Sequence, residues 1–180
     1  MNELFYKGEL KMNQSKTRQS SRWSIAAISK MGMVTALYVA VTVFLSVISF
    51  GAIQIRLSEG FNFLAIYNKR YILSVTLGVM IANLASPLGI VDVVIGGSAT
   101  FLTLLCASFV AGKIAHPIWK IVATTLIFSC SMFTVAGELA FFYQLPFWST
   151  WFVVGLGELI SMSLGGALMH LVNKKIDLSI

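Results

Sequence analysis

Long uncharged stretches alternate with short polar or charged segments along most of this chain. After Lys30 the chain carries no charged residue until Arg56. The uncharged or nearly uncharged runs cover residues 31–50, 57–67, 71–91, 93–112, 121–142 and 147–173. A helix needs about 20 apolar residues to span a bilayer, and every run except the second reaches that length. The pattern therefore predicts an all-α, polytopic membrane protein.

The run over residues 57–67 is too short to cross by length alone, since such a helix reaches only ~17 Å against a hydrocarbon core of ~30 Å. The distribution of Lys and Arg decides the question. If all six runs cross with the N-terminus inside, 12 of the 13 Lys and Arg lie inside and only Arg56 lies outside. If the second run does not cross, this bias disappears. We therefore predict a bundle of six transmembrane helices with cytoplasmic N- and C-termini, the second helix being short, tilted or extended around Arg56.

Composition supports this organisation. The chain is 57% hydrophobic and 11% charged, whereas soluble domains carry about 25% charged residues, so a soluble globular enzyme is excluded. The predicted parts are a polar, basic cytoplasmic segment (1–30), one transmembrane domain (31–173) and a short cytoplasmic tail (174–180). The net charge of +6 is scattered between apolar runs rather than gathered on one face, so we expect no nucleic-acid partner.

Motifs for chemistry are missing from the sequence. There is no phosphate-binding loop of the form G-x-x-x-x-G-K-[ST] and no H-E-x-x-H. We therefore expect no catalytic residue, no metal site and no enzymatic activity. Energy for any active transport has to come from a partner or an ion gradient.

Acidic residues lie where the membrane makes them costly. Glu59, Asp92, Glu138 and Glu158 lie within or at the ends of apolar runs, and an ionisable group there costs about 2.5–3.5 kcal/mol. The six-helix topology places the first three toward the outer face, and Glu158 about 16 Å into the last helix, near the midplane. With Arg56, the only outer cation, these residues carry a local formal charge of −3.

Structural explanations stay open for three of these acids. Arg56 and Glu59 are spaced to pair on one helix face. Asp92 is placed to be the N-cap of the fourth helix, and Glu138 to extend toward interfacial water. Glu158 has no comparable explanation.

Aromatic and amide residues accompany the acids. Glu158 shares a helix face with Trp151 and Gly155, and Asn62 and Asn83 are further amides in the outer half. The aromatic residues near Pro146 are Phe141, Phe142, Tyr143, Phe147, Trp148 and Trp151. Most of them are interpreted as an interfacial belt, while one or two are candidates to stack on a flat ligand. Such a cavity suits a planar ligand rich in N–H donors, or a cation.

Small residues recur on the first helix. Gly32, Ala36 and Ala40 are four residues apart, a pattern that allows another helix to approach closely. A partner protein and packing inside the same bundle are both open interpretations. The pairs Gly96-Gly97 and Gly165-Gly166 are expected to serve internal packing.

Two segments carry a resemblance to a known family. They are Ile48-Ser-Phe-Gly-Ala-Ile-Gln-Ile-Arg-Leu-Ser-Glu59, and Ile81-Ala-Asn-Leu84 followed by Ser86-Pro-Leu-Gly-Ile-Val-Asp-Val-Val94. These segments resemble the QueT family, the substrate-binding (S) components of energy-coupling factor (ECF) transporters for queuosine precursors. The resemblance covers roughly residues 31–172.

The resemblance implies a six-helix protein in a prokaryotic plasma membrane that captures queuine or aminomethyl-deazaguanine from outside. It implies a transmembrane coupling subunit and two cytoplasmic ATPase subunits as partners, so that ATP is used by the partners and no cofactor is bound by this chain. It also implies that Ala36 and Ala40, with Gly32 on the same stripe, dock on the coupling subunit. The loops carrying Arg56 and Asp92 would gate the pocket.

The residues then divide by expected role. Glu158 or Glu138 would read the base, Asp92 or Glu59 would meet the amine, and Trp148 or Trp151 would cover the ring. The full predicted binding set is Arg56, Glu59, Asn62, Asn83, Asp92, Glu138, Trp148, Trp151 and Glu158. The alternatives are a proton-coupled carrier that uses the intramembrane carboxylates, and a structural membrane protein whose acids pair internally.

Overall fold

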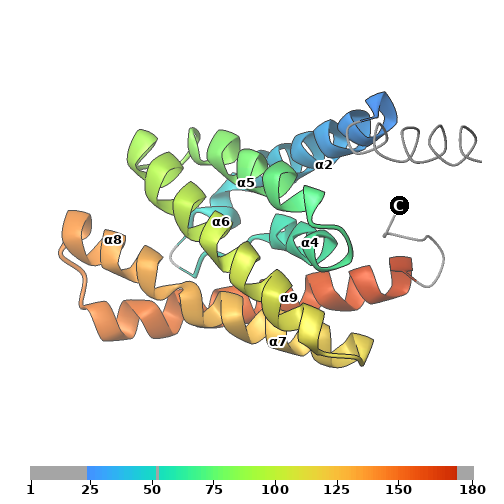
Figure 1. The fold of residues 1–180 in the computed structure, drawn as a ribbon. Helices are drawn as coiled ribbons and strands as arrows, with labels where there is room; N and C mark the ends of the chain where they lie inside the picture. Colours follow the sequence, from blue (N-terminus) through green and yellow to red (C-terminus); the bar gives the residue numbers. More distant parts are fainter. Residues whose placement is uncertain (1–23, 52, 174–180) are drawn as a thin grey trace, which may run out of the picture.

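The computed structural model describes residues 24–51 and 53–173, and all the regular structure within them is helical (Figure 1). The elements are α2 (Ile25–Phe44), α3 (Ser46–Ser49), the 3-10 helix η2 (Leu57–Phe63), α4 (Leu64–Tyr67), α5 (Arg70–Asn83), α6 (Ile90–Lys113), α7 (Pro117–Ser131), α8 (Phe133–Tyr143) and α9 (Phe147–Asn173). Most of the basic N-terminal segment and the C-terminal tail lie outside the described residues.

Within the described residues, four helical stretches are long and apolar enough to cross a bilayer: α2, α6, α7 continued by α8, and α9. Their outer surfaces carry large apolar side chains in the open, such as Phe44 at 88% exposure and Phe109 at 65%. A water-soluble monomer rarely exposes apolar surface on this scale, whereas lipid accommodates it. The predicted all-α, polytopic membrane protein is confirmed at this level.

The second apolar run is predicted as one helix that is short, tilted or extended around Arg56, and the structure divides it into two short elements. It forms η2, which is 3-10, followed by the single turn α4. The segment lies in the middle of the bundle, where η2 packs against α2 and α9 (Figure 1). Gly60 and Gly165 are in backbone contact there, since a Cβ at Gly60 would lie 2.9 Å from the Cα of Gly165. The expected packing role of Gly165-Gly166 is confirmed.

The third apolar run forms a helix that is shorter than the run itself. Helix α5 ends at Asn83 although the uncharged run continues to residue 91, because Pro87 disfavours helical backbone in the residue before it. The Ser86 hydroxyl donates to the Asn83 carbonyl oxygen at 2.7 Å and accepts from the Gly89 N–H at 3.1 Å. Gly89 has a φ of 55°, which glycine adopts without strain. Helix α6 then begins at Ile90.

A hydrophobic core joins the helices. Its largest fully buried side chains come from α2, η2, α5, α6, α7 and α9: Tyr38, Phe63, Val75, Val79, Leu104, Phe128 and Met162. This core ties the central η2–α4 segment to the surrounding helices.

The connections between helices gather at two ends of the bundle. The α4–α5 and α6–α7 connections lie on the same side as the first turn of α2 and the last turn of α9, at the right of Figure 1. The α5–α6 turn and the α8–α9 connection lie at the opposite end. The functional site is built from segments near this second end.

Candidate functional site

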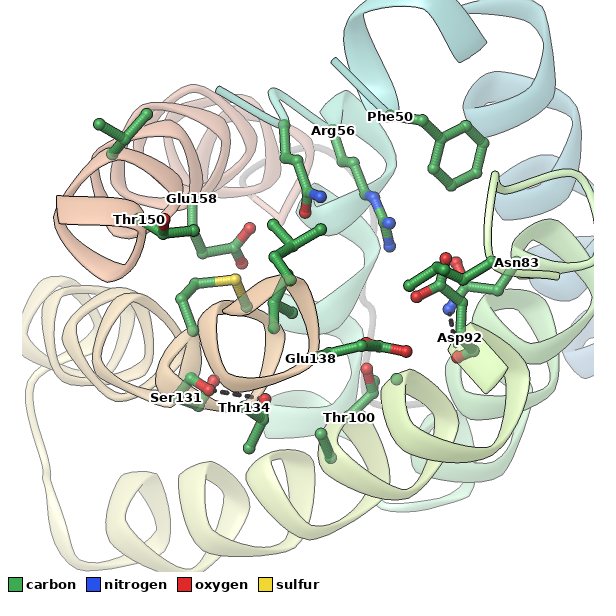
Figure 2. A pocket seen from close by; sticks show the side chains of 18 of the residues that line it. Phe50, Arg56, Asn83, Asp92, Thr100, Ser131, Thr134, Glu138, Thr150 and Glu158 are labelled. Carbon is green, nitrogen blue, oxygen red and sulfur yellow. Dashed lines mark hydrogen bonds between the residues drawn. The ribbon is translucent and has the colours of Figure 1, made fainter. Parts of the chain in front are cut away.

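A cavity of about 470 Å³ lies between the helices, within the ~300–1,000 Å³ range of small-molecule sites. Figure 2 shows its walls. They come from the segment after α3, from η2, α5, α6, α7, α8 and α9, and from the α5–α6 and α8–α9 connections. Of the predicted binding residues, the lining includes Arg56, Glu59, Asn83, Asp92, Glu138 and Glu158. The structure therefore brings Glu59, Asp92, Glu138, Glu158 and Arg56 into a single cavity.

Arg56 enters the cavity from the segment that follows α3. Its backbone is extended, and its backbone N–H donates to the Ser161 hydroxyl at 3.0 Å. Its Nε donates to the Ser49 carbonyl oxygen at 3.1 Å, and its Cζ lies 4.9 Å from the centre of the Phe50 ring, within cation–π range. These contacts hold the guanidinium pointing into the cavity (Figure 2).

Gly157 on α9 allows the segment that carries Arg56 to pack closely against this helix. A Cβ at Gly157 would collide with the carbonyl oxygen of Ile53, so the segment can lie directly on the helix only because that position has no side chain. Glu158 follows immediately and lines the cavity. The close packing thus brings Arg56 and Glu158 into one wall region.

Glu59 is held by a hydrogen-bond network rather than by Arg56. The Tyr38 hydroxyl donates to its Oε1 at 2.6 Å, and the Asn62 amide donates to its Oε2. All three side chains are buried. The interpretation of Arg56 and Glu59 as a pair on one helix face is wrong, because Arg56 precedes η2 in extended backbone. Asn62 serves Glu59 and is not part of the cavity lining.

We expect Tyr38→Phe to destabilise the fold. The substitution removes the donor to Glu59 Oε1 and leaves a buried oxygen unpaired, which costs about 1–3 kcal/mol. Thermal unfolding of the detergent-purified protein measures the effect. Tyr67→Phe, at the partly buried end of α4, is the matched control. Equal melting temperatures for the two variants would contradict a structural role for this bond.

Asn83 is oriented by two neighbours on α6. Its Nδ2 donates to the Asp92 backbone carbonyl oxygen at 2.9 Å, and a Cβ at Gly96 would lie 2.6 Å from that Nδ2. The amide oxygen Oδ1 is buried and has no hydrogen-bond partner among the residues that the structure describes. Asp92 lies in the first turn of α6, and Gly89 is the N-cap, so the interpretation of Asp92 as an N-cap is wrong.

Glu138 on α8 and Glu158 on α9 are the deepest acids in the lining. Their side chains are 5% and 2% exposed, and Oε1 of each has no hydrogen-bond partner among residues 24–51 and 53–173. Figure 2 shows both carboxyl groups directed into the cavity, so Glu138 does not extend toward interfacial water. A buried polar atom left unpaired costs about 1–3 kcal/mol. These two acceptor oxygens are therefore available to accept hydrogen bonds from a ligand.

Trp148 and Trp151 lie outside the cavity lining. Trp148 is 75% exposed, and the Trp151 indole N–H donates to the Cys130 carbonyl oxygen at 3.2 Å. The two rings lie 5.9 Å apart and pack with Phe147 on the outside of the α8–α9 corner. This position suits the interfacial belt.

Sequence reasoning missed several residues of the cavity wall. Phe50 and Phe128 are the phenylalanines of the lining, and Thr100 and Thr103 add hydroxyl groups from α6. Phe50 stands in the first segment that resembles the QueT family, so its position was a usable signal. Phe128 sits in an apolar run with no feature that distinguishes a cavity wall from a core position.

Comparison with known proteins agrees with the resemblance noted in the sequence. The model of the family described as QueT transporter matches residues 28–174. The chain belongs to the QueT transporter family. A relative, the "Queuosine precursor transporter QueT" of Lactococcus lactis subsp. cremoris (strain MG1363), is 38% identical over 171 residues, which cover 90% of this chain and 99% of that protein. No solved structure matches the chain. Membership of the QueT family confirms the family prediction made from residues 48–59, 81–84 and 86–94.

Proposed function

We propose that this chain is the substrate-capture (S) subunit of an ECF-type importer and binds a queuosine precursor, queuine or aminomethyl-deazaguanine, from outside the cell. The observation that carries the proposal is the set of buried acceptors without partners in the cavity: Asn83 Oδ1, Glu138 Oε1 and Glu158 Oε1. A deazaguanine is planar and rich in N–H donors, so it can satisfy such acceptors with charge-assisted bonds. The proposed binding residues are the members of the predicted set that line the cavity, namely Arg56, Glu59, Asn83, Asp92, Glu138 and Glu158, with Phe50 and Phe128 as further candidates to contact the ring.

Six membrane passes with both termini cytoplasmic are part of the proposal. Lys69 lies in the α4–α5 connection and Arg70 begins α5, while Lys113 ends α6 and Lys120 lies in the first turn of α7, on either side of the α6–α7 connection. Both connections lie at the same end as the terminal turns of α2 and α9 (Figure 1), as the positive-inside rule requires. The η2–α4 segment runs toward this end and α5 runs back, so the topology is the same whether these two short elements cross fully or partly. The membrane would be a prokaryotic plasma membrane.

Helix α2 offers the surface for a coupling subunit. The buried residues of α2 are Tyr38 and Thr42, and Ala36 and Ala40 lie on the opposite, exposed face. A Cβ at Gly32 would meet no atom within 4 Å. Small residues on an exposed apolar helix allow a partner helix to approach closely. The proposed partners are a transmembrane coupling subunit and two cytoplasmic ATPases, which would use the ATP, while this chain acts without a cofactor and is not an enzyme.

A binding panel tests the proposal. The detergent-purified chain is mixed with queuine, aminomethyl-deazaguanine, guanine or thiamine, and its melting temperature is followed. At a ligand concentration 1,000 times the Kd, binding stabilises by about 4 kcal/mol, which raises the Tm by roughly 8–16 °C. A shift of this order for a deazaguanine and none for thiamine supports the proposal. No shift with any deazaguanine overturns it.

A proton-coupled carrier is the second candidate, favoured by the same unpaired carboxyl groups of Glu138 and Glu158. It predicts uptake by this chain alone in liposomes under a pH gradient. The importer subunit predicts no concentrative uptake until the coupling subunit and the ATPases are present with ATP.

A further inference from the structure

Three acceptors from three different helices meet on one side of the cavity. Asn83 on α5 is bonded to the backbone of Asp92 on α6. The carboxyl group of Glu138 on α8 lies close enough to that of Asp92 for the two to interact directly. Figure 2 shows these three side chains converging on one side of the cavity, while Glu158 approaches from the other side. The cavity therefore has two chemically distinct ends.

The acceptor oxygen of Asn83 is fixed in its direction. The bond from Nδ2 to the Asp92 carbonyl oxygen makes the other amide atom an oxygen, and the missing side chain at Gly96 leaves room for the amide in this orientation. Asn83 is 2% exposed and its Oδ1 has no partner. Its Oδ1 is therefore positioned to accept a hydrogen bond from a ligand.

We propose that Asn83, Asp92 and Glu138 form a subsite for a primary ammonium group, leaving Glu158 to bind the ring system. The assignment rests on the proposed function, because it divides that cavity between the two ends of one ligand. It makes Gly96 a positioning residue, since Gly96 acts only through the orientation of Asn83.

The chemistry of an ammonium group matches this subsite. A primary ammonium carries one positive charge and three N–H donors, and the subsite offers one acceptor from each of three helices. Two carboxylates facing each other away from water repel strongly, and a cation between them turns that repulsion into attraction. Arg56 is held by Ser49 and Phe50, and its single charge leaves the four acids of the lining in excess.

The proposal predicts an order of affinity among queuosine precursors. Aminomethyl-deazaguanine has a primary ammonium, which supplies all three donors. Queuine has a secondary ammonium, which supplies two donors and brings a bulky substituent into the subsite. The cyano-deazaguanine base has neither a charge nor a donor at this position. Affinity should fall in that order.

Calorimetric titration of the full chain with the aminomethyl and cyano bases tests the assignment. We expect the wild type to bind the aminomethyl base at least about 100-fold more tightly, the effect of two or more charge-assisted hydrogen bonds. Asp92→Asn, Glu138→Gln and Gly96→Ala should each weaken aminomethyl binding by about 10–100-fold and change cyano binding by less than about three-fold. Ser98→Ala, on the exposed face of α6, is the matched control and should change neither.

The outcomes separate this assignment from the proposed function. Equal affinity of the wild type for the two bases, or equal losses for both bases in the Asp92→Asn and Glu138→Gln variants, overturns the ammonium subsite and leaves the proposed function standing. Failure of the wild type to bind any deazaguanine overturns the proposed function itself. Melting temperatures of the ligand-free variants identify a folding defect, and the two isosteric variants keep the test decisive if Gly96→Ala does not fold.

Discussion

Uptake by the assembled importer is expected to stop when Ala36 and Ala40 are both replaced by leucine, while ligand binding by the purified chain stays within about two-fold of wild type, because sites far apart act independently. Both alanines lie on the exposed face of α2, opposite the buried Tyr38 and Thr42. Leucine side chains there add bulk only where a partner helix has to come close. The measurements are ATP-driven uptake in proteoliposomes and ligand binding in detergent.

The matched control for this pair is on α9. Ser163 and Ala167 are also small, exposed and four residues apart, and their replacement by leucine should leave uptake unchanged. Retention of uptake in the Ala36→Leu/Ala40→Leu variant would contradict the docking face. Loss of binding in that variant would show that the substitutions disturb the bundle itself.

The Glu158→Gln variant is expected to lose about 10–100-fold in affinity for a deazaguanine, the value of one charge-assisted hydrogen bond in a buried site. Glu158 is 2% exposed, and no residue in the described part of the chain forms a hydrogen bond with its Oε1. Glutamine keeps the shape but has only one acceptor oxygen and no charge. Because the substitution removes a costly buried ionisable group, we expect the ligand-free protein to be at least as stable as the wild type.

Calorimetric titration measures this effect, with Ser163→Ala on the exposed face of α9 as the control. Unchanged affinity in Glu158→Gln would remove Glu158 from the binding site. A lower melting temperature without ligand would instead show that Glu158 supports the fold, as expected for the alternative of a structural membrane protein.

Membrane helices were predictable from sequence because a bilayer requires a continuous stretch of apolar residues, which can be recognised from the order of residues alone. A length of about 20 apolar residues and the absence of charge identified α2, α6, the α7–α8 pair and α9. The same reasoning was weakest for the segment over 57–67 and for the end of α5. Most of the 57–67 segment is surrounded by protein in place of lipid, so its helix length is set by neighbours such as Gly165. The end of α5 is set by the turn at Pro87 rather than by membrane thickness.

The candidate site was predictable in its composition but not in its geometry. An ionisable side chain is energetically costly inside a membrane, and this identified Glu59, Asp92, Glu138 and Glu158 as residues that need a partner. All four line one cavity. Their different situations depend on contacts between distant segments. The Tyr38 hydroxyl on α2 donates a hydrogen bond to Glu59, whereas no residue of the described chain forms a hydrogen bond with Oε1 of Glu158.

The sequence by itself determined that this protein lies in a membrane, the approximate positions of its membrane helices, the kinds of side chains at its site and its family. These properties follow from local chemistry, namely hydropathy, charge and short motifs. Only the tertiary structure decided which acid is hydrogen-bonded within the protein and which has an acceptor oxygen left for a ligand. It also decided that Trp148 and Trp151 lie outside the cavity. Those properties depend on which atoms of α2, α5, α6, α8 and α9 come within hydrogen-bonding distance, and the order of residues along one chain does not specify that distance.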